Sequence, residues 1–106
     1  MKPSQDCQNM AELRTQIDLL DRRLVALLAR RADYIDRAIT LKPAESLPAR
    51  ISDRVDAVIA NVRAAARDEG LDPELAADLW TTLIEWSIAR EERVLGPSPD
   101  RQDTDP

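Results

Sequence analysis

Apolar residues recur at alternating steps of three and four along the first part of the chain, which is the spacing of one face of an α-helix. This stripe predicts one long helix of roughly 30 residues. We expect it to end at Pro43, because the residue before a proline is pushed out of the helical region. The stripe consists of Met10, Leu13, Ile17, Leu20, Leu24, Leu27, Tyr34, Ala38 and Leu41.

Two shorter helices are predicted after it. The turn Ser46-Leu47-Pro48 is expected to open the first, with proline near its first position, and Gly70 is expected to cap its end. Asp72-Pro73-Glu74 then reads as an N-cap, a first-turn proline and an acid that suits the helix dipole, and this last helix extends to about Leu95. The apolar stripe of the second helix consists of Ile51, Val55, Val58, Val62 and Ala65.

The pattern therefore predicts an all-α protein of three helices, one long and two shorter. We expect the helical domain over residues 10–95, a polar segment over 1–9, and a disordered tail over 96–106 that is rich in proline and aspartate. Only two glycines and few β-branched runs argue against a sheet.

The predicted long helix is too long for the rest of the chain to cover. At about 1.5 Å per residue it measures roughly 45 Å, whereas a compact chain of this length has a radius of gyration near ~13 Å. The two shorter helices, of about 20 residues each, cannot cover its whole apolar stripe. We therefore expect an intertwined homodimer in which a second copy covers it.

Composition excludes several classes of function. The chain has 106 residues, which suits one domain, and 20 acidic against 15 basic residues, which disfavours nucleic acid and anionic membranes as partners. The absence of histidine removes histidine-dependent triads and metal sites. A single cysteine, Cys7, and the lack of a membrane-spanning or signal-like stretch favour a cytoplasmic protein. Without phenylalanine, the core is expected to be aliphatic.

Arg31 interrupts the stripe of the long helix, one turn after Leu27. A guanidinium that faces a core is costly unless it meets an anion. The anion is either an acid of the chain, such as Asp33 or Asp36, or a bound anionic ligand, and a third alternative is a side chain that reaches past the core to solvent. The pattern leaves these alternatives open.

Ser87 and Glu91 continue the face of the last helix that begins with Trp80 and Ile84. A serine within a helix is often a small packing residue, and an acid near a helix end is often on the surface. The alternative is a polar site on this face, to which the two residues contribute a hydroxyl and a carboxyl group.

Three more cations accompany Arg31. Arg14 has a simple alternative in an ion pair with Asp18, one turn away. Lys42 suits the C-terminal end of the helix dipole, and Arg54, like Arg50, is a residue that is usually solvated.

Taken in order, Arg14, Arg31, Lys42, Arg54 and Ser87-x-x-x-Glu91 on a long-short-short set of helices resemble the all-helical chorismate mutase family, with most likeness to its isochorismate-pyruvate lyases. The resemblance runs from about Asp6 to Leu95. It is carried by Leu13-Arg14-x-x-Ile17-Asp18-x-x-Asp21, Arg30-Arg31-x-Asp33-Tyr34, Lys42, and Gly70-Leu71-Asp72 followed by Ile84-x-Trp86-x-Ile88-Ala89.

The resemblance implies a pericyclic conversion of chorismate to prephenate that needs no cofactor or metal. It implies that Arg14 of one chain and Arg31 of the other clamp the two carboxylates of the substrate. By the same resemblance, Lys42 donates to the ether oxygen, Arg54 adds positive potential, and Ser87 hydrogen-bonds a carboxylate.

Two positions depart from the pattern of the family. Many members have glutamine where this chain has Glu91, and a carboxyl group donates a hydrogen bond only when it is protonated, so we expect activity to be favoured at acidic pH. Typical mutases have glutamate at the position of Val55, and an apolar residue there favours a lyase that yields salicylate and pyruvate from isochorismate. A non-catalytic helical dimerisation module is the third alternative.

Overall fold

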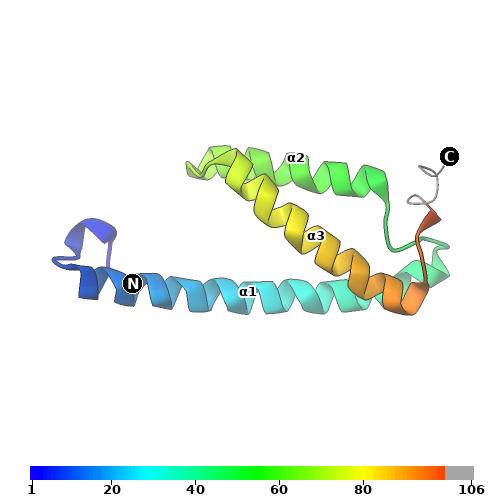
Figure 1. The fold of residues 1–106 in the computed structure, drawn as a ribbon, viewed down its shortest axis with the longest axis horizontal. Coiled ribbons are helices and arrows are strands. Elements are labelled where there is room, and N and C mark those ends of the chain that lie inside the picture. Colours follow the sequence, from blue (N-terminus) through cyan, green and yellow to red (C-terminus); the bar gives the residue numbers. More distant parts are fainter. Residues whose placement is uncertain (100–106) are drawn as a thin grey trace. The chain divides into compact units, whose positions relative to one another are not determined.

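The computed structural model describes residues 1–99 and shows them as helices joined by short loops (Figure 1). The elements are a 3-10 helix η1 (Ser4–Asp6) and the α-helices α1 (Met10–Ala44), α2 (Ser52–Glu69) and α3 (Pro73–Leu95). No strand occurs within residues 1–99, so the prediction of an all-α fold is confirmed. The chain divides into two compact units, Met1–Tyr34 and Ile35–Pro106, and the division falls within α1.

The N-terminal unit begins with a cap on α1. The Asn9 side chain accepts a hydrogen bond from the Glu12 amide at 2.9 Å, and the Glu12 carboxylate accepts one from the Gln8 amide at 2.7 Å. Lys2 pairs with the same carboxylate at 3.2 Å. The Gln8 amide and Lys2 lower the pKa of Glu12 below its ordinary value. Residues 1–9, predicted only as a polar segment, thus contain η1 and the helix cap.

The end of α1 differs by one residue from the prediction that the helix ends at Pro43. The helix continues through Pro43 to Ala44. Proline removes one backbone donor, and so close to the helix end only one further residue follows it. The Lys42 carbonyl then accepts hydrogen bonds from the amides of Glu45 at 3.1 Å and Leu47 at 2.9 Å, which end the helix.

The start of α2 also differs from the prediction, which placed Pro48 near its first position. The helix begins at Ser52, and Ile51 precedes it without a side-chain cap. The residues between Pro48 and Ile51 are not helical because Ala49 enters the core, where it is only 3% exposed. The segment 45–51 is therefore a loop, which we call the α1–α2 loop.

The turn between α2 and α3 follows the prediction. Gly70 has a left-handed backbone with φ 75°, and its amide donates to carbonyls of the last turn of α2. The Asp72 side chain accepts a hydrogen bond from the Glu74 amide at 2.9 Å, and Pro73 is the first residue of α3.

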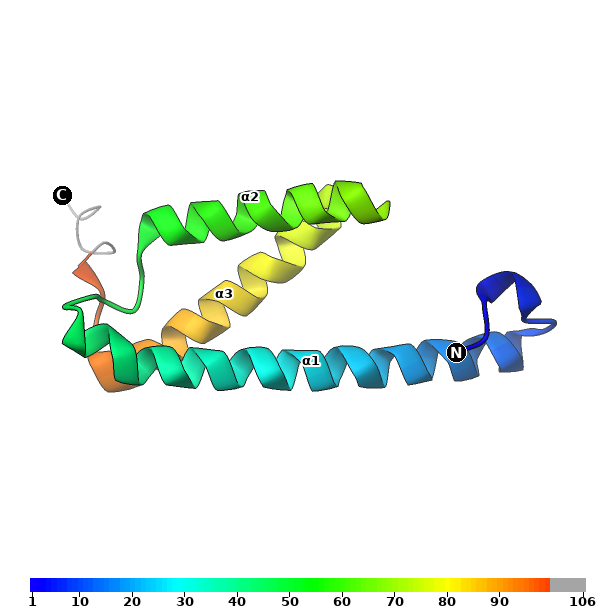
Figure 2. The same ribbon diagram turned by 180° about the vertical axis from the view of Figure 1, so that it is seen from behind.

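The core of the C-terminal unit lies where α3 packs against α2 and the α1–α2 loop. Its buried cluster is Ala49, Ile84 and Ile88. Half-buried side chains pack against this cluster, and they are Val55, Val58, Ile59, Trp80 and Leu95. The core is aliphatic as predicted, with the addition of the Trp80 ring. Both views show the last turns of α3 beside the last turns of α1 (Figures 1 and 2).

Segment 96–99 packs onto this unit, although the prediction assigned it to a disordered tail. Gly96 caps α3, and Ser98 is completely buried. The remainder of the predicted tail, 100–106, lies outside the described residues.

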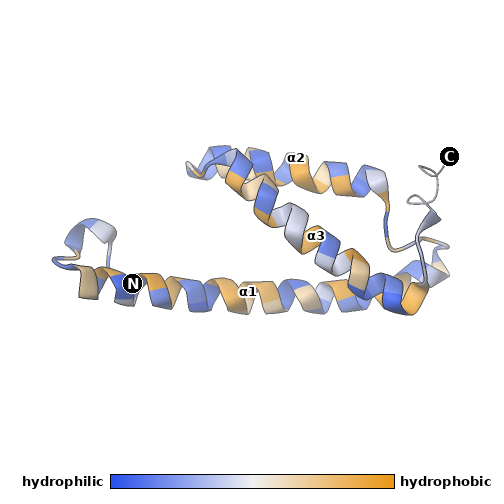
Figure 3. Cartoon of the chain, viewed as in Figure 1, coloured by the Kyte–Doolittle hydropathy of each residue, from blue (hydrophilic) through white to orange (hydrophobic). Residues whose placement is uncertain are grey.

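No residue of α1 is buried, and its apolar stripe stays largely open to solvent in the single chain. Apolar and polar segments alternate along the helix (Figure 3). The exposed large side chains of the stripe are Met10, Ile17, Leu20, Leu24, Leu27, Tyr34 and Leu41. None of the helices described in residues 1–99 is long and apolar enough to cross a membrane.

An ion pair joins α1 to α3 within the C-terminal unit. Two nitrogens of the Arg90 guanidinium donate to the two carboxylate oxygens of Asp36, one of them at 3.1 Å. The guanidinium also lies over the Trp86 ring, 5.4 Å from its centre. The hydrogen bond from Arg90 holds the pKa of Asp36 below its ordinary value.

Asp36→Asn is expected to lower the urea midpoint of unfolding slightly at pH 7. Because the pKa of Asp36 is lowered in the folded chain, its stabilisation is present above the unfolded pKa and is lost as pH falls through the folded one. The difference between variant and wild type is therefore expected to shrink as pH falls below about 4 and to vanish below the lowered pKa of folded Asp36. Asp56→Asn, an exposed change on α2, serves as the control. A difference for Asp36→Asn that stays constant from pH 7 to pH 2.5 would contradict the prediction.

Candidate active site

Lys42 and Glu91 form a shielded ion pair between the end of α1 and α3. The Lys42 ammonium lies 2.8 Å from Glu91 Oε1 and donates a hydrogen bond to the Ala49 carbonyl at 2.7 Å. The Lys42 side chain is 17% exposed and the Glu91 side chain 4%. Oε1 of Glu91 receives no hydrogen bond of good geometry, so the pair is held by charge and proximity. This places a cation and a carboxyl group in contact where water is largely excluded.

The periodicity of α3 explains how Glu91 reaches this position. Ile84, Ser87, Ile88 and Glu91 are all buried, so they share the inward face of the helix. The prediction that the face of Ile84 continues through Ser87 and Glu91 is therefore confirmed, and a surface role for Glu91 in the single chain is excluded by its burial. The Ser87 hydroxyl donates to the Leu83 carbonyl at 2.8 Å, so in this rotamer the hydroxyl proton is engaged in a hydrogen bond within α3.

The structure places the candidate arginines as follows. Arg54 is exposed in the first turn of α2, within the same unit as Lys42 and Glu91. Arg14 is exposed and Arg31 half-buried, both on the part of α1 that belongs to the N-terminal unit. Among the predicted site residues, the structure brings Lys42 and Glu91 into contact.

Arg50 and Asp36, two residues with open roles at the level of sequence, have partners in the structure. Arg50 donates to Glu85 Oε2 at 2.9 Å, in a two-point ion pair between the α1–α2 loop and α3. Asp36, one candidate partner for Arg31, is engaged by Arg90.

The Ala49 carbonyl is a group at this candidate site that the sequence did not predict. It fixes the Lys42 ammonium at one end while Glu91 attracts it at the other. A backbone carbonyl leaves no mark in a sequence, because every residue carries one. Ala49 follows two prolines and precedes the start of a helix, and its burial depends on packing against residues that are distant in sequence.

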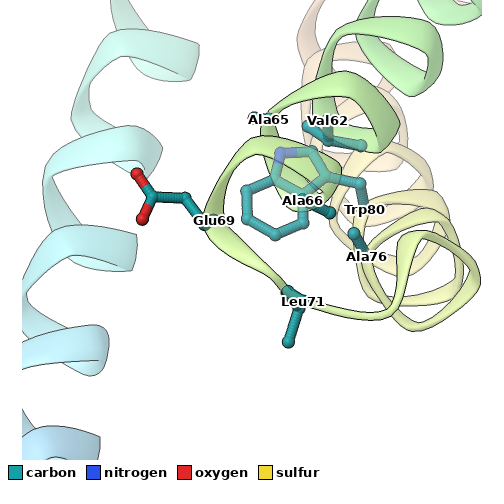
Figure 4. Close-up of a pocket in the computed structure, with 7 residues that line it drawn as sticks. All are labelled: Val62, Ala65, Ala66, Glu69, Leu71, Ala76 and Trp80. Carbon is teal, nitrogen blue, oxygen red and sulfur yellow. The ribbon is translucent and has the colours of Figure 1, made fainter.

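A separate hollow lies near the turn between α2 and α3 (Figure 4). Its lining is apolar except for one carboxylate, and it contains no cation. A negatively charged ligand would therefore find no compensating charge there. The lining residues are Val62, Ala65, Ala66, Glu69, Leu71, Ala76 and Trp80.

Comparisons with known proteins bear on this arrangement. The family described as chorismate mutase type II matches residues 13–92, a range that contains every candidate site residue from Arg14 to Glu91. The isochorismate pyruvate lyase of Pseudomonas aeruginosa is 35% identical over 92 residues, which cover 86% of this chain and 89% of the lyase. The T-protein of Haemophilus influenzae is 29% identical over 82 residues, which cover 77% of this chain but 22% of the T-protein. The chain belongs to the chorismate mutase type II family.

Proposed function

We propose that this chain converts chorismate to prephenate by a pericyclic rearrangement that uses no cofactor or metal. The observation that carries the proposal is the shielded Lys42–Glu91 pair. A rearrangement of this kind needs no nucleophile. It is accelerated by holding one conformer of the substrate and by stabilising the negative charge that develops on the ether oxygen.

Lys42 is suited to the second task. An ammonium has three N–H groups, of which one goes to the Ala49 carbonyl and another faces Glu91. Within residues 1–99 the ammonium has no third partner, so one donor is left for a ligand. Because its surroundings are largely shielded from water, a hydrogen bond from this group to developing charge is stronger than it would be in solution.

Glu91 fits this role when it carries a proton. As a carboxylate it only accepts hydrogen bonds, and it repels a dianionic substrate; as a carboxylic acid it becomes a second donor beside Lys42. The expectation that activity is higher at acidic pH stays a prediction, which the assay below tests.

The proposed substrate is a small dianion whose carboxylates are held by Arg14, Arg31 and Arg54, with Ser87 as a further contact after a change of rotamer. We propose a homodimer in which Arg14 reaches the site of the partner subunit. The exposed apolar stripe of α1 supports this, since a large apolar patch is seldom left in water. The free thiol of Cys7 and the acidic composition support a cytoplasmic location and partners other than nucleic acid or membranes.

A specific observation favours a second candidate, isochorismate pyruvate lyase. Val55, directly after Arg54, is half-buried against the Ala49, Ile84 and Ile88 cluster and offers no polar group to a ring hydroxyl. The lyase of Pseudomonas aeruginosa is also similar over nearly the whole of both chains. Both reactions need the same stabilisation of a leaving ether oxygen, so the pair of Lys42 and Glu91 serves either.

The deciding experiment is a paired assay of kcat/KM for chorismate and for isochorismate, at pH 5 and at pH 7.5. Prephenate formation that exceeds pyruvate release, with a higher rate at pH 5 than at pH 7.5, is the expected result. Dominant release of pyruvate and salicylate would establish the lyase. A rate that is flat or rises with pH would exclude the proposed role of Glu91. Inactivity toward both substrates would leave a helical dimerisation module.

A further inference from the structure

We propose that Ser98 is a positioning residue that orients Lys42 through a single peptide group, the one between Ala49 and Arg50. The carbonyl of this group accepts the hydrogen bond of the Lys42 ammonium at 2.7 Å. Its N–H belongs to Arg50 and donates to Ser98 Oγ at 2.8 Å. The two ends of one peptide are thus held by side chains that lie far apart in the sequence. The consequence for turnover rests on the proposed function, but the positioning itself does not.

The rigidity of the peptide makes this arrangement effective. A trans peptide is planar, and its N–H and C=O point in opposite directions. Fixing the N–H therefore fixes the direction of the carbonyl, and with it the place where the Lys42 ammonium is held. Ser98 Oγ thus anchors the N–H end of a peptide in a loop that has no regular structure.

Ser98 is itself held firmly. It is 0% exposed, and its amide donates to Glu92 Oε2 at 3.2 Å. Gly96, with a backbone φ of 83°, turns the chain at the end of α3 so that this segment meets the α1–α2 loop. Ala49 is 3% exposed, so water does not readily replace the lost hydroxyl. Removing Oγ is therefore expected to take away the acceptor that Ser98 gives to the Arg50 N–H at a partly buried position.

The composition of the chain allows a direct test. There are two lysines, Lys2 and Lys42, so labelling with ¹³C,¹⁵N-lysine gives two sets of side-chain NMR signals. Lys2 lies in the N-terminal unit and serves as the internal reference. The variant is Ser98→Ala. The matched control is Ser46→Ala, which makes the same chemical change at an exposed serine of the α1–α2 loop, the loop that contains the Ala49–Arg50 peptide.

In Ser98→Ala, the Lys42 ε signals are expected to shift while those of Lys2 remain. Hydrogen exchange of the Arg50 amide is expected to become about tenfold faster, as for the loss of one hydrogen bond. Ser46→Ala changes neither. Unchanged Arg50 exchange, or faster exchange with unmoved Lys42 signals, would overturn the proposal. If Ser98→Ala fails to fold, the wild-type chain still provides a test, because rapid exchange of its Arg50 amide would overturn the proposal.

Turnover supplies a third readout. Displacing the donor at the reacting oxygen is expected to lower kcat about tenfold with little change in KM, because the donor acts on charge that develops in the transition state. Ser98→Thr keeps the hydroxyl and is expected to restore both kcat and the Lys42 signals. An unchanged kcat beside shifted Lys42 signals would refute the catalytic consequence. Inactivity of the wild type would refute the proposed function alone, since the NMR result still decides the positioning.

Discussion

Lys42→Met is expected to lower kcat/KM by about 10³-fold, the size of effect found when one donor to a developing oxyanion is removed. Methionine keeps the unbranched shape of the side chain and removes only its charge and hydrogen bonds. The other lysine gives a matched control, since Lys2 forms an exposed pair with Glu12 in the N-terminal unit. Lys2→Met is expected to retain full activity. A Lys42→Met enzyme with more than a tenth of wild-type activity would exclude Lys42 as the main donor.

The same variant is expected to be less stable, and this effect is separable from the loss of activity. Lys42→Met leaves the Glu91 carboxylate in a site that is 4% exposed, without its cation. Removing one partner of such a pair typically costs about 3 kcal/mol of unfolding free energy. Adding Glu91→Gln removes the unpaired charge, so the double variant is expected to regain most of the stability in urea unfolding but none of the activity. Recovery of both would mean that Lys42 acts through folding alone.

Local sequence signals predicted most of the helical boundaries. Gly70 and Asp72-Pro73 mark a helix end and a helix start through backbone preferences that act within a few residues, and the structure has both. The cap formed by Asn9 and Glu12 also has a local sequence signal, an Asn-x-x-Glu pattern before an apolar stripe, but it is not among the predicted features. The periodicity of α3 also placed Ser87 and Glu91 on the buried face, since a helix fixes the direction of each side chain whatever packs against it.

The features that were mispredicted depend on contacts distant in sequence. Pro48 looked like a helix start, but Ala49 is drawn into the core and the chain stays irregular up to Ile51. Segment 96–99 looked disordered because of its prolines, yet Ser98 is buried 48 residues away in sequence from its partner Arg50. Composition reports average tendencies and does not reveal which loop meets which tail.

The candidate site, like the fold, was predictable from the sequence only in part. The residue types and their order suggested a shared anionic ligand, and the structure brings Lys42 and Glu91 into contact across 49 residues of sequence, from position 42 to 91. Neither the Ala49 carbonyl nor the peptide that carries it was visible in the pattern. A sequence therefore indicates which charges are candidates for a site, whereas the groups that orient them emerge only from the packing.

Mixing two inactive variants is expected to restore activity if the proposed homodimer shares its sites between subunits. Arg14→Ala lacks the residue that we propose acts on the partner's site, and Lys42→Met lacks the donor in its own site. Each homodimer is expected to lose about 10³-fold in kcat/KM. Unfolding and refolding the two chains together in equal amounts produces heterodimers, in which one of the two sites contains both Arg14 and Lys42.

Random pairing makes half of the dimers heterodimers, and one site in each is intact, so about a quarter of wild-type activity is expected. If Arg14 instead serves the same chain as Lys42, every site of every dimer lacks one of the two residues, and activity stays at the level of the single variants. A mixture of Arg14→Ala with the double variant Arg14→Ala/Lys42→Met is the control, because none of its sites contains Arg14. Activity in that control would mean that Arg14 is dispensable. Recovery confined to the first mixture requires a dimer whose sites are built from both chains.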